Sequence, residues 1–535
     1  MKKNFFLIKK SILIVLLLLI SPLHLEAKIY SLKEIEKMPK SIARDYYIWR
    51  LLNETKVSKK EALKAYTLVY KKSYKIKKVF RKVLGYLPDS STKRDPKNFI
   101  IYPETASKKS KRELKKLYKK IQKQGKYSDV LKVMASDNPF EALKSVTPKT
   151  FCYIFNRCGS SYRKKYLNYP LSREQLDRLT KEKQFVQSIF KIVTTPKLNR
   201  LRYSLLDINT THLPFKSVFL LGINAVTFNK IDKAVEFFKI AKTKIDKQSS
   251  IDSCNFWLYL LTKDKKYLQL LRQSSQINIY TLKARDIMKL PYPKPNIPDL
   301  KFSLVKYFDP HSPIDWANIK IAIKEHPETI DVLADNYESS LTQGVYSYLK
   351  EKASNYKTEY FAMPYQDAMF GKSQERIALI YAIARQESRF VPASISPSYA
   401  LGLMQIMPFL IKHLAKQRHE KIDLDDMFDP YISIKYANTH LDYLTKYLYH
   451  PLLIAYAYNG GIGFTRRTLR SSHLFKKGKY EPFLSMELID YEESKEYAKK
   501  VLANYVIYYN ILGGDITISK LLNQLYNPLL TDKFR

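Results

Sequence analysis

Residues 377–408 read IALIYAIARQESRFVPASISPSYALGLMQIMP, and they place one carboxylate on the apolar face of an expected helix. Ile380, Ile383 and Ala384 recur at helical spacing. Glu387 lies seven, four and three residues after them and therefore shares their face. A carboxyl group held against apolar neighbours loses the hydration of its charged form, so its pKa should rise. The pattern predicts that Glu387 can keep a proton near neutral pH, as a general acid must.

The same position also fits an ordinary structural interpretation. Glu387 is close to the end of the expected helix, because Pro392 follows soon after it. There it could pair with Arg385 or Arg389, and ion-paired glutamates at helix ends greatly outnumber catalytic ones. Periodicity alone favours this second interpretation, so the choice depends on the segments that follow.

Three further segments accompany this carboxylate in the C-terminal part of the chain. A turn-rich loop containing Ser396 leads into Leu-Gly-Leu-Met-Gln-Ile-Met-Pro at 401–408. Ala-Tyr-Asn-Gly-Gly-Ile-Gly follows at 457–463, and Glu-Ser-Lys-Glu-Tyr at 493–497. Eight of the 13 glycines lie after residue 370, so this is the part where the backbone must turn tightly or approach a ligand.

Together these segments resemble the lytic transglycosylase domain of the soluble, Slt-type murein transglycosylases, in the goose-lysozyme-like group. That family has a Glu-Ser pair that closes a helix, then G-L-M-Q-I-M-P, A-Y-N-A-G and a late E-T-R-x-Y-V segment. The resemblance covers residues 360–505 in detail, and four motifs in the family's order are a specific signal.

Several positions depart from the family's pattern. Tyr399 stands where a Gly often precedes the Ala before G-L-M-Q, and Gly460 replaces the second Ala of A-Y-N-A-G. Ile462 stands in place of the usual following Pro, and Ser494-Lys495 replaces Thr-Arg after the late Glu. None of these changes removes the acid, whereas Tyr399 and Ile462 bear on the fine shape of the sugar-binding groove.

The resemblance implies the chemistry of Glu387. In the family a single Glu protonates the glycosidic oxygen and then, as a carboxylate, removes the proton from the C6 hydroxyl of the same muramyl sugar. This internal hydroxyl replaces water, because an intramolecular nucleophile has a high effective concentration. The implied product is a 1,6-anhydro-muramyl end, and no cofactor is required. The nine histidines show no metal-ligand spacing, so we expect no metal site.

Other site residues also take their roles from the resemblance. Ser396 would polarise the N-acetyl group of the muramyl unit, while Met404 and Gln405 would line the groove. Tyr458 and Asn459 would place a phenol and an amide near the acid and the sugar. Structural roles stay open for all of them: a Ser-Pro turn, simple core packing, and a glycine-rich turn with Asn capping the next helix.

Glu493 would be a buried support that fixes Tyr458 or a neighbouring loop by hydrogen bonds. Glu492 is equally placed on the sequence alone. The alignment with the segment that ends at Tyr497 prefers Glu493.

The N-terminus indicates export. Residues 1–27 combine early lysines, an apolar run and the ending Leu25-Glu26-Ala27, which are the parts of a secretory signal peptide. The apolar run is short for a membrane span, although an uncleaved N-terminal anchor stays open. No Cys precedes Cys152, which argues against a lipid-anchored lipoprotein.

The remaining chain is predicted to be all-α. Glycine is only 13 of 535 residues, which favours helices. Residues 28–356 read as amphipathic helix hairpins of an α-helical solenoid, with a tetratricopeptide-like pair at 215–245 and a linker near 290–300. By the resemblance, residues 357–535 form a lysozyme-like, mainly helical transglycosylase domain.

The net charge limits the classes of binding partner, and the cysteine content leaves two disulfide alternatives. Lys and Arg number 93 against 50 Asp and Glu, a net charge of +43 that suits an anionic polymer, an anionic membrane surface or nucleic acid. The export signal argues against nucleic acid, and murein with its peptide carboxylates is an anionic polymer. Cys152 and Cys158 could close a small loop and leave Cys254 over, or all three could be buried thiols.

The resemblance implies an exported, periplasmic lytic transglycosylase that cleaves the β-1,4 bond between N-acetylmuramic acid and N-acetylglucosamine in peptidoglycan glycan strands. Contacts with cell-wall synthesis or division proteins and with a membrane surface stay open. So do two other functions: a murein hydrolase of the same fold, which needs a second carboxylate, and a helical-repeat murein-binding scaffold without turnover. The candidates for that second carboxylate are Asp423, Asp425, Asp426, Asp429, Asp442 and Glu493.

Overall fold

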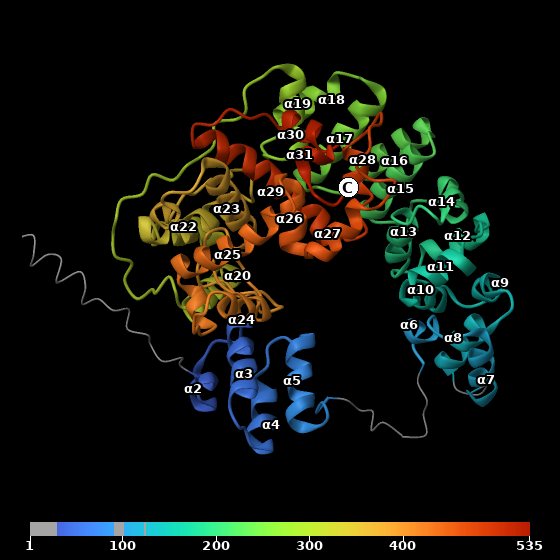
Figure 1. The fold of residues 1–535 in the computed structure, drawn as a ribbon, viewed down its shortest axis with the longest axis horizontal. Coiled ribbons are helices and arrows are strands. Elements are labelled where there is room, and N and C mark those ends of the chain that lie inside the picture. The colour runs from blue at the N-terminus through green and yellow to red at the C-terminus, as the bar shows by residue number, and fades with distance from the viewer. Residues whose placement is uncertain (1–28, 90–100, 122–124) are drawn as a thin grey trace, which may run out of the picture. The chain divides into compact units, whose positions relative to one another are not determined.

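The computed structural model describes residues 29–89, 101–121 and 125–535. Within these residues the regular structure is helical, and no strand occurs beyond isolated bridges between single residues. The all-α prediction is therefore confirmed (Figure 1). The predicted signal peptide at 1–27 lies outside the described residues. Among the helices that are described, none combines the length and the apolar character needed to cross a bilayer.

Short helices follow one another along the whole described chain. The helices before residue 205 are α2 (Leu32–Lys37), α3 (Ile42–Glu54), α4 (Lys59–Leu68), α5 (Tyr74–Leu84), α6 (Pro103–Ala106), α7 (Lys111–Ile121), α8 (Gly125–Ala135), α9 (Pro139–Lys144), α10 (Pro148–Arg157), α11 (Ser160–Tyr166), α12 (Arg173–Thr180), α13 (Phe185–Val193) and α14 (Asn199–Ser204). The middle of the chain holds α15 (Phe215–Thr227), α16 (Ile231–Thr243), α17 (Gln248–Thr262), α18 (Lys266–Gln273), α19 (Ile279–Met288), α20 (Pro313–Glu325), α21 (Ile330–Asp335) and α22 (Gln343–Ala353). The C-terminal helices are α23 (Gln374–Glu387), α24 (Pro408–Gln417), α25 (Pro430–Thr445), α26 (Pro451–Gly460), α27 (Ile462–Leu469), α28 (Phe483–Glu487), α29 (Glu492–Ile511), α30 (Ile518–Gln524) and α31 (Pro528–Thr531).

Local sequence signals set many of the helix ends. The Ser31 and Ser58 hydroxyls each accept a hydrogen bond from the backbone N–H three residues on. The Glu34 and Glu61 carboxylates in turn accept from the backbone N–H of the capping serine. These capping boxes satisfy N–H groups that a helix start leaves without partners. Gly85 ends α5 in the left-handed region, with φ 84°, where a residue with a side chain is disfavoured.

The described chain divides into two compact units, and each is discontinuous in sequence. The first unit contains the described residues 29–89 together with Phe308–Lys324 and Pro392–Ser433. The second unit contains the remaining described residues, including α6–α19, α21–α23 and the chain from Ile434 to Arg535. The sequential order of the predicted domains does not anticipate this grouping, and their boundary at 356/357 stays a prediction.

An ionic cluster ties α3 to the segment 392–433 inside the first unit. The guanidinium of Arg50 lies 2.6 Å from Asp423 Oδ2 and 2.8 Å from Asp425 Oδ1. The Tyr46 hydroxyl donates to Asp425 Oδ1 over 2.7 Å. Because Arg50 is only 2% exposed, its charge is stable there only while these carboxylates neutralise it.

Tyr399 adds an aromatic contact to the same junction. Its ring lies 5.9 Å from the ring of Tyr46 and 5.5 Å from that of Trp49. Its backbone has φ 57°, the left-handed region that favours glycine. The Gly that the family often has here would fit this backbone without strain. Tyr399 is strained in this conformation, but its ring packs against α3.

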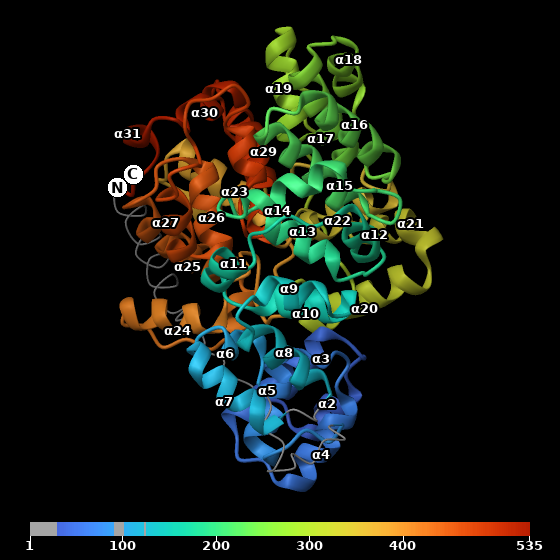
Figure 2. The same cartoon turned by 90° about the vertical axis from the view of Figure 1, so that its right-hand side faces the viewer.

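Helices α15–α19 pack one against the next within the second unit, as Figures 1 and 2 show. The helix pair expected at 215–245 is confirmed as α15 and α16. A Cβ added at Gly222 would lie 2.8 Å from the ring of Phe238, so the glycine permits this close approach of the two helices. Between Met288 and Pro313 the chain has no helix.

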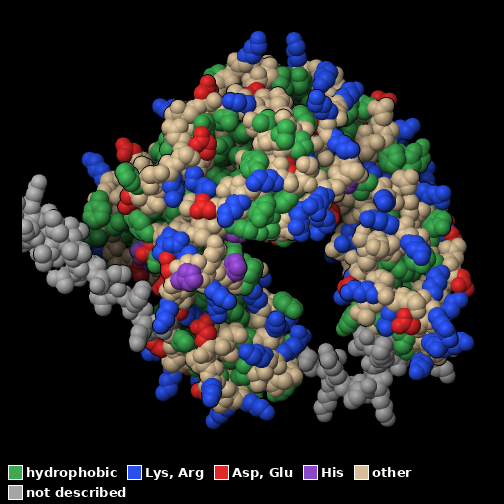
Figure 3. Space-filling model, viewed as in Figure 1, with side chains coloured by type: hydrophobic (Ala, Val, Ile, Leu, Met, Phe, Trp, Pro, Cys, Tyr) green, Lys and Arg blue, Asp and Glu red, His purple; other side chains and the backbone are tan. Residues whose placement is uncertain are grey.

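The structure places the three cysteines and, in the view of Figure 3, the basic side chains. Cys152, Cys158 and Cys254 are all buried and free, so Cys152 and Cys158 do not form a disulfide in this structure. Lys and Arg side chains are spread over the face seen in Figure 3 and are not gathered in one patch.

Candidate active site

The helix that carries the candidate acid, α23, begins at a side-chain cap and runs through the core of the second unit. The Ser373 hydroxyl accepts from the Arg376 N–H at the start of the helix. The stretch from Ala378 to Arg385 is buried without interruption, and α29 packs along it. The helix ends at Glu387, where the Ser388 N–H donates to Ala384.

A tight turn follows Glu387 immediately. Arg389 and Phe390 have φ 53° and 64°, both in the left-handed region. Two consecutive residues with side chains in this region store backbone strain, which persists only where the surroundings enforce it. Here α22 enforces it: a Cβ added at Gly344 would lie 2.2 Å from the Phe390 carbonyl oxygen. The backbone of α22 therefore lies directly against the turn that ends α23.

The Glu387 carboxyl lies in an environment that favours its protonated form. Burial is the main effect and raises the pKa of Glu387 to about 8, with the nearby charge of Glu493 raising it further. The Tyr497 hydroxyl donates to Glu387 Oε1 over 2.8 Å and opposes this rise, because it stabilises the carboxylate. The residue as a whole keeps some exposed surface. The rise expected from the apolar face is confirmed.

Tyr458 and Asn459 are neighbours near the C-terminal end of α26. Burial and then the charge of Glu387 raise the pKa of Tyr458 well above its ordinary value, which places the phenol close to the acid. The ring of Tyr458 is 5.7 Å from that of His440. Asn459 Oδ1 accepts from the Ser494 hydroxyl over 2.5 Å, so its amide is held by α29.

Gly460 has a structural reason for departing from the Ala of the family. A Cβ at this position would lie 2.6 Å from both the Phe464 ring and Ser494 Oγ. The glycine therefore leaves room for the hydrogen bond between Ser494 and Asn459.

The prediction that Glu493 is a buried support is wrong in its burial. Glu493 is exposed in the first turn of α29 and accepts from the Tyr491 hydroxyl over 3.4 Å. One helical turn later, Tyr497 is buried and makes the hydrogen bond to Glu387. Glu493 and Tyr497 are four residues apart and share one face of α29, but Glu493 lies in the first turn, where the helix end is open to solvent. Helical spacing alone therefore does not distinguish the exposed residue from the buried one. Sequence reasoning missed Tyr497 as a site residue, although it ends the same motif.

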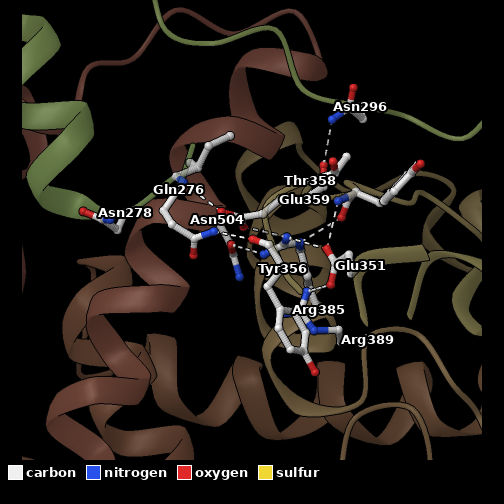
Figure 4. Close-up of polar contacts among 12 residues, drawn as sticks. Gln276, Asn278, Asn296, Glu351, Tyr356, Thr358, Glu359, Arg385, Arg389 and Asn504 are labelled. Atoms are coloured by element: carbon white, nitrogen blue, oxygen red, sulfur yellow. Dashed lines mark hydrogen bonds and ion pairs between the residues drawn. The ribbon is translucent and has the colours of Figure 1, made fainter. Parts of the chain in front are cut away.

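The structure also excludes the ion pair that was the alternative interpretation of Glu387. Arg385 Nη2 lies 3.0 Å from Glu351 Oε1 and 2.9 Å from Glu359 Oε2 (Figure 4). Arg389 pairs with the other oxygen of Glu351. Among the described residues no cation lies within ion-pair distance of Glu387.

Further hydrogen bonds complete the arginine network shown in Figure 4. Arg385 Nη1 donates to Asn504 Oδ1 over 2.9 Å, which joins α23 to α29. The Tyr360 N–H donates to Glu351 Oε1 over 2.8 Å. The network thus fixes the C-terminal half of α23 against α22 and α29. In the described chain it leaves the Glu387 carboxyl, at the end of the same helix, without a cation within ion-pair distance.

Ser396, Met404 and Gln405 belong to the first unit, whereas Glu387 belongs to the second. Ser396 Oγ accepts from the Ala400 N–H over 2.9 Å, in keeping with a turn role. Met404 is fully buried, and Gln405 Nε2 donates to the Gly402 carbonyl over 2.8 Å. Their common groove with Glu387 stays a prediction.

Most carboxylates named as second catalytic groups have other partners. Asp423 and Asp425 pair with Arg50, and Asp442 pairs with Arg376 at 2.6 Å. Asp426 and Asp429 accept hydrogen bonds from the backbone at helix starts. No group of three His, Cys, Asp or Glu side chains suited to a metal is found in the part of the chain that the structure describes.

The C-terminal region that contains Glu387 matches a known protein family. Residues 367–480 match the transglycosylase SLT domain. The matched SLT segment includes Glu387, the 401–408 motif and the 457–463 motif. The resemblance stated from the motifs is thus confirmed for this segment.

Curated relatives match the SLT segment and its surroundings. The chain is 31% identical over 195 residues to a putative soluble lytic murein transglycosylase of Haemophilus influenzae, covering 35% of this chain and 31% of that protein. It is 30% identical over 209 residues to the soluble lytic murein transglycosylase of Escherichia coli K12, covering 38% and 31%. The chain thus matches about a third of the length of these curated relatives.

Solved structures resemble the chain over more of its length. An inactive variant of the lytic transglycosylase Slt from Pseudomonas aeruginosa has 15% identity and a TM-score of 0.48, with 91% of this chain and 84% of that chain covered. The 70 kDa soluble lytic transglycosylase of Escherichia coli has 16% identity and a TM-score of 0.44, with 93% and 85% covered. At these scores the similarities carry no functional conclusion.

Proposed function

We propose that this protein is a peptidoglycan lytic transglycosylase and that Glu387 is its acid and base. It cleaves the β-1,4 bond between N-acetylmuramic acid and N-acetylglucosamine and leaves a 1,6-anhydromuramyl end. The observation that carries the proposal is the Glu387 carboxyl itself, which is enclosed, has no cation partner in the described chain and has a pKa raised to about 8. Its position in a segment that matches the SLT domain supports the same chemistry.

The two states of Glu387 supply the two proton transfers. The protonated carboxyl gives its proton to the glycosidic oxygen while the bond from that oxygen to C1 breaks. The resulting carboxylate takes the proton of the C6 hydroxyl, whose oxygen bonds to C1 of the same sugar, and Glu387 regains its proton. The Tyr497 hydroxyl, 2.8 Å from Oε1, stabilises the carboxylate between these steps. No water is consumed and no redox change occurs.

The wider organisation is part of the same proposal. Residues 1–27 direct export to the periplasm, 28–356 form the helical solenoid and 357–535 hold the catalytic domain. Ser396, Met404 and Gln405 line the glycan groove together with Tyr458 and Asn459. The substrate is the glycan strand of peptidoglycan.

The test is mass spectrometry of muropeptides released from purified murein by the protein and by Glu387→Gln. We expect products lighter than hydrolytic ones by one water and resistant to borohydride reduction. The variant should release them about 10³-fold more slowly, because it lacks the proton that both steps use. Reducing ends from the unmodified protein would identify a hydrolase. Murein binding without product would identify a scaffold.

A further inference from the structure

A cavity of about 550 Å³ lies in the second unit, and Glu387, Tyr458 and Tyr497 are not among its lining residues. Residues of α13, α15, α17, α19, α28 and α29 form its walls together with the loops beside them. A cavity of this size holds one small organic ligand. It is therefore a second candidate site, separate from the proposed active site.

One wall of the cavity is apolar. It is made by Phe190, Phe215, Phe219, Leu220 and Ile279. Phe219 and Ile279 are buried, so this wall is continuous with the core of the second unit. Such a surface favours the apolar part of a ligand.

The floor of the cavity is charged and internally balanced. Glu487 is 2% exposed and accepts from the Tyr280 hydroxyl over 2.6 Å and from Lys499 over 3.0 Å. Lys499 also lies 2.9 Å from Glu496, and Lys495 lies 3.4 Å from Glu487. The acids of the floor are thus already neutralised by lysines.

The third acid of the lining is neutralised as well. Glu492 pairs with Lys216 at 2.7 Å. Lys244, Lys247 and Lys500 also line the cavity, and in the described chain none of these lysines has a carboxylate within ion-pair distance. The lining therefore carries an excess of positive charge.

Lys247 and Lys500 approach the cavity from different helices. Lys247 precedes α17, and Lys500 lies in α29. The pKa of Lys500 is lowered first by burial and then by the positive charge of Lys247, so the two ammonium groups lie close enough to repel each other. An anion between them would replace this repulsion by two attractions.

The start of α17 adds donors at the same place. Lys247 is the N-cap of this 15-residue helix and makes no capping hydrogen bond with its side chain. Ser249 and Ser250 of the first turn line the cavity. The N–H groups and the dipole at a helix start both favour negative charge.

We propose that this cavity binds a small amphipathic anion with a carboxylate or phosphate head. The head lies between Lys247, Lys500 and the start of α17. The apolar body lies against the wall that includes Phe215 and Phe219. The proposal does not rest on the proposed catalytic function, because its test measures binding alone.

The test uses the full chain and the fluorescent anion 1-anilinonaphthalene-8-sulfonate, with octanoate, octyl phosphate and neutral octanol as competitors. We expect one binding site from which the two anions displace the dye better than octanol does. Lys247→Ala/Lys500→Ala should weaken dye binding roughly tenfold, because two charge-assisted contacts are lost. Displacement by one anion alone supports the proposal and identifies the head group.

The matched control is Lys239→Ala/Lys520→Ala, which removes the same charge from exposed positions outside the cavity lining. It should leave dye binding unchanged. Lys247 and Lys500 both keep solvent-exposed side-chain surface although they line the cavity, so their variants should keep the melting temperature of the parent. Lys247→Glu/Lys500→Glu should abolish binding. Equal losses in the cavity and control pairs, or dye binding that survives charge reversal, would overturn the proposal.

Discussion

Two enclosed glutamates beside α23 have opposite electrostatic surroundings. Glu351 of α22 is 1% exposed and lies between the guanidinium groups of Arg385 and Arg389. Glu387 ends α23 and has a tyrosine hydroxyl as its hydrogen-bond donor. The first carboxylate is compensated by cations and acts as a structural anchor. The second is uncompensated and can hold a proton, so the placement of arginines separates a scaffold residue from a catalytic one.

Removing the anchor should cause the largest loss of stability. Glu351→Gln leaves Arg389 without its carboxylate, and the buried Arg385 then has only Glu359 as an ion-pair partner among the described residues. We expect a loss of about 3 kcal/mol in the free energy of unfolding, measured by urea denaturation. Asp137→Asn breaks an exposed pair with Lys115 and should leave the free energy of unfolding nearly unchanged. Equal effects of the two variants would contradict the anchor role.

Glu387→Gln should have the opposite effect on stability, and the effect should depend on pH. The unfolded glutamate loses its proton near pH 4.5, whereas the folded Glu387 keeps it up to about pH 8. The folded state therefore binds more protons between these values, and parent stability falls as pH rises through this window. As pH rises through this window, the free energy of unfolding of the variant should increase relative to that of the parent by at most about 1.4 kcal/mol per pH unit.

Urea denaturation at pH 5 and pH 8 measures this gain. The exposed Glu236→Gln is the control, and its difference from the parent should stay constant over the same range. A Glu387→Gln difference that is independent of pH would contradict the raised pKa.

Gly344 connects the two glutamates, since it lies in the helix of Glu351 and touches the turn after Glu387. Gly344→Ala places a Cβ 2.2 Å from the Phe390 carbonyl oxygen and should cost about 1–3 kcal/mol. Murein turnover should fall as well, because the turn must shift. Gly463→Ala is the matched control in α27, where an added Cβ meets nothing within 4 Å. It should be neutral or stabilise by up to about 1 kcal/mol.

The smallest effect is expected from Tyr497→Phe. The hydroxyl stabilises the carboxylate of Glu387, so its removal should raise the pKa of Glu387 above about 8. The alkaline limb of the pH–rate profile should move up by at most about 1 unit. Tyr491→Phe removes a hydroxyl that contacts the exposed Glu493 and should leave the profile in place. A downward shift for Tyr497→Phe would count against the assigned hydrogen bond.

The sequence predicts well what depends on local periodicity. The helix over Ile380 to Glu387 and the raised pKa both follow from the spacing of apolar residues. Arg385 could not be placed in the same way, because its partner Glu351 lies 34 residues away. The sequence also does not show how deeply a residue near a helix end is buried. Glu493 was expected to be buried but is exposed, and the buried Tyr497 was not recognised as a site residue.

The discontinuous first unit also escaped sequence reasoning. Tyr399 could be recognised as a departure from the family, but not as a contact of Tyr46 and Trp49. Such contacts depend on residues more than 300 positions apart, for which helix periodicity carries no information. Which segments form the first unit can therefore be seen only in the three-dimensional structure.

The junction between Arg50 and Asp423 has a consequence for synthesis of the chain. The two residues are 373 positions apart, and at roughly 5–20 residues per second a ribosome needs about 20–75 s between them. During that interval the Arg50 guanidinium of α3 can pair with Glu54 but lacks Asp423 and Asp425, and the aromatic side chains of α3 lack Tyr399. Completion of the first unit thus waits until the chain has passed residue 433, and the exposed apolar surface of α3 is open to aggregation until then.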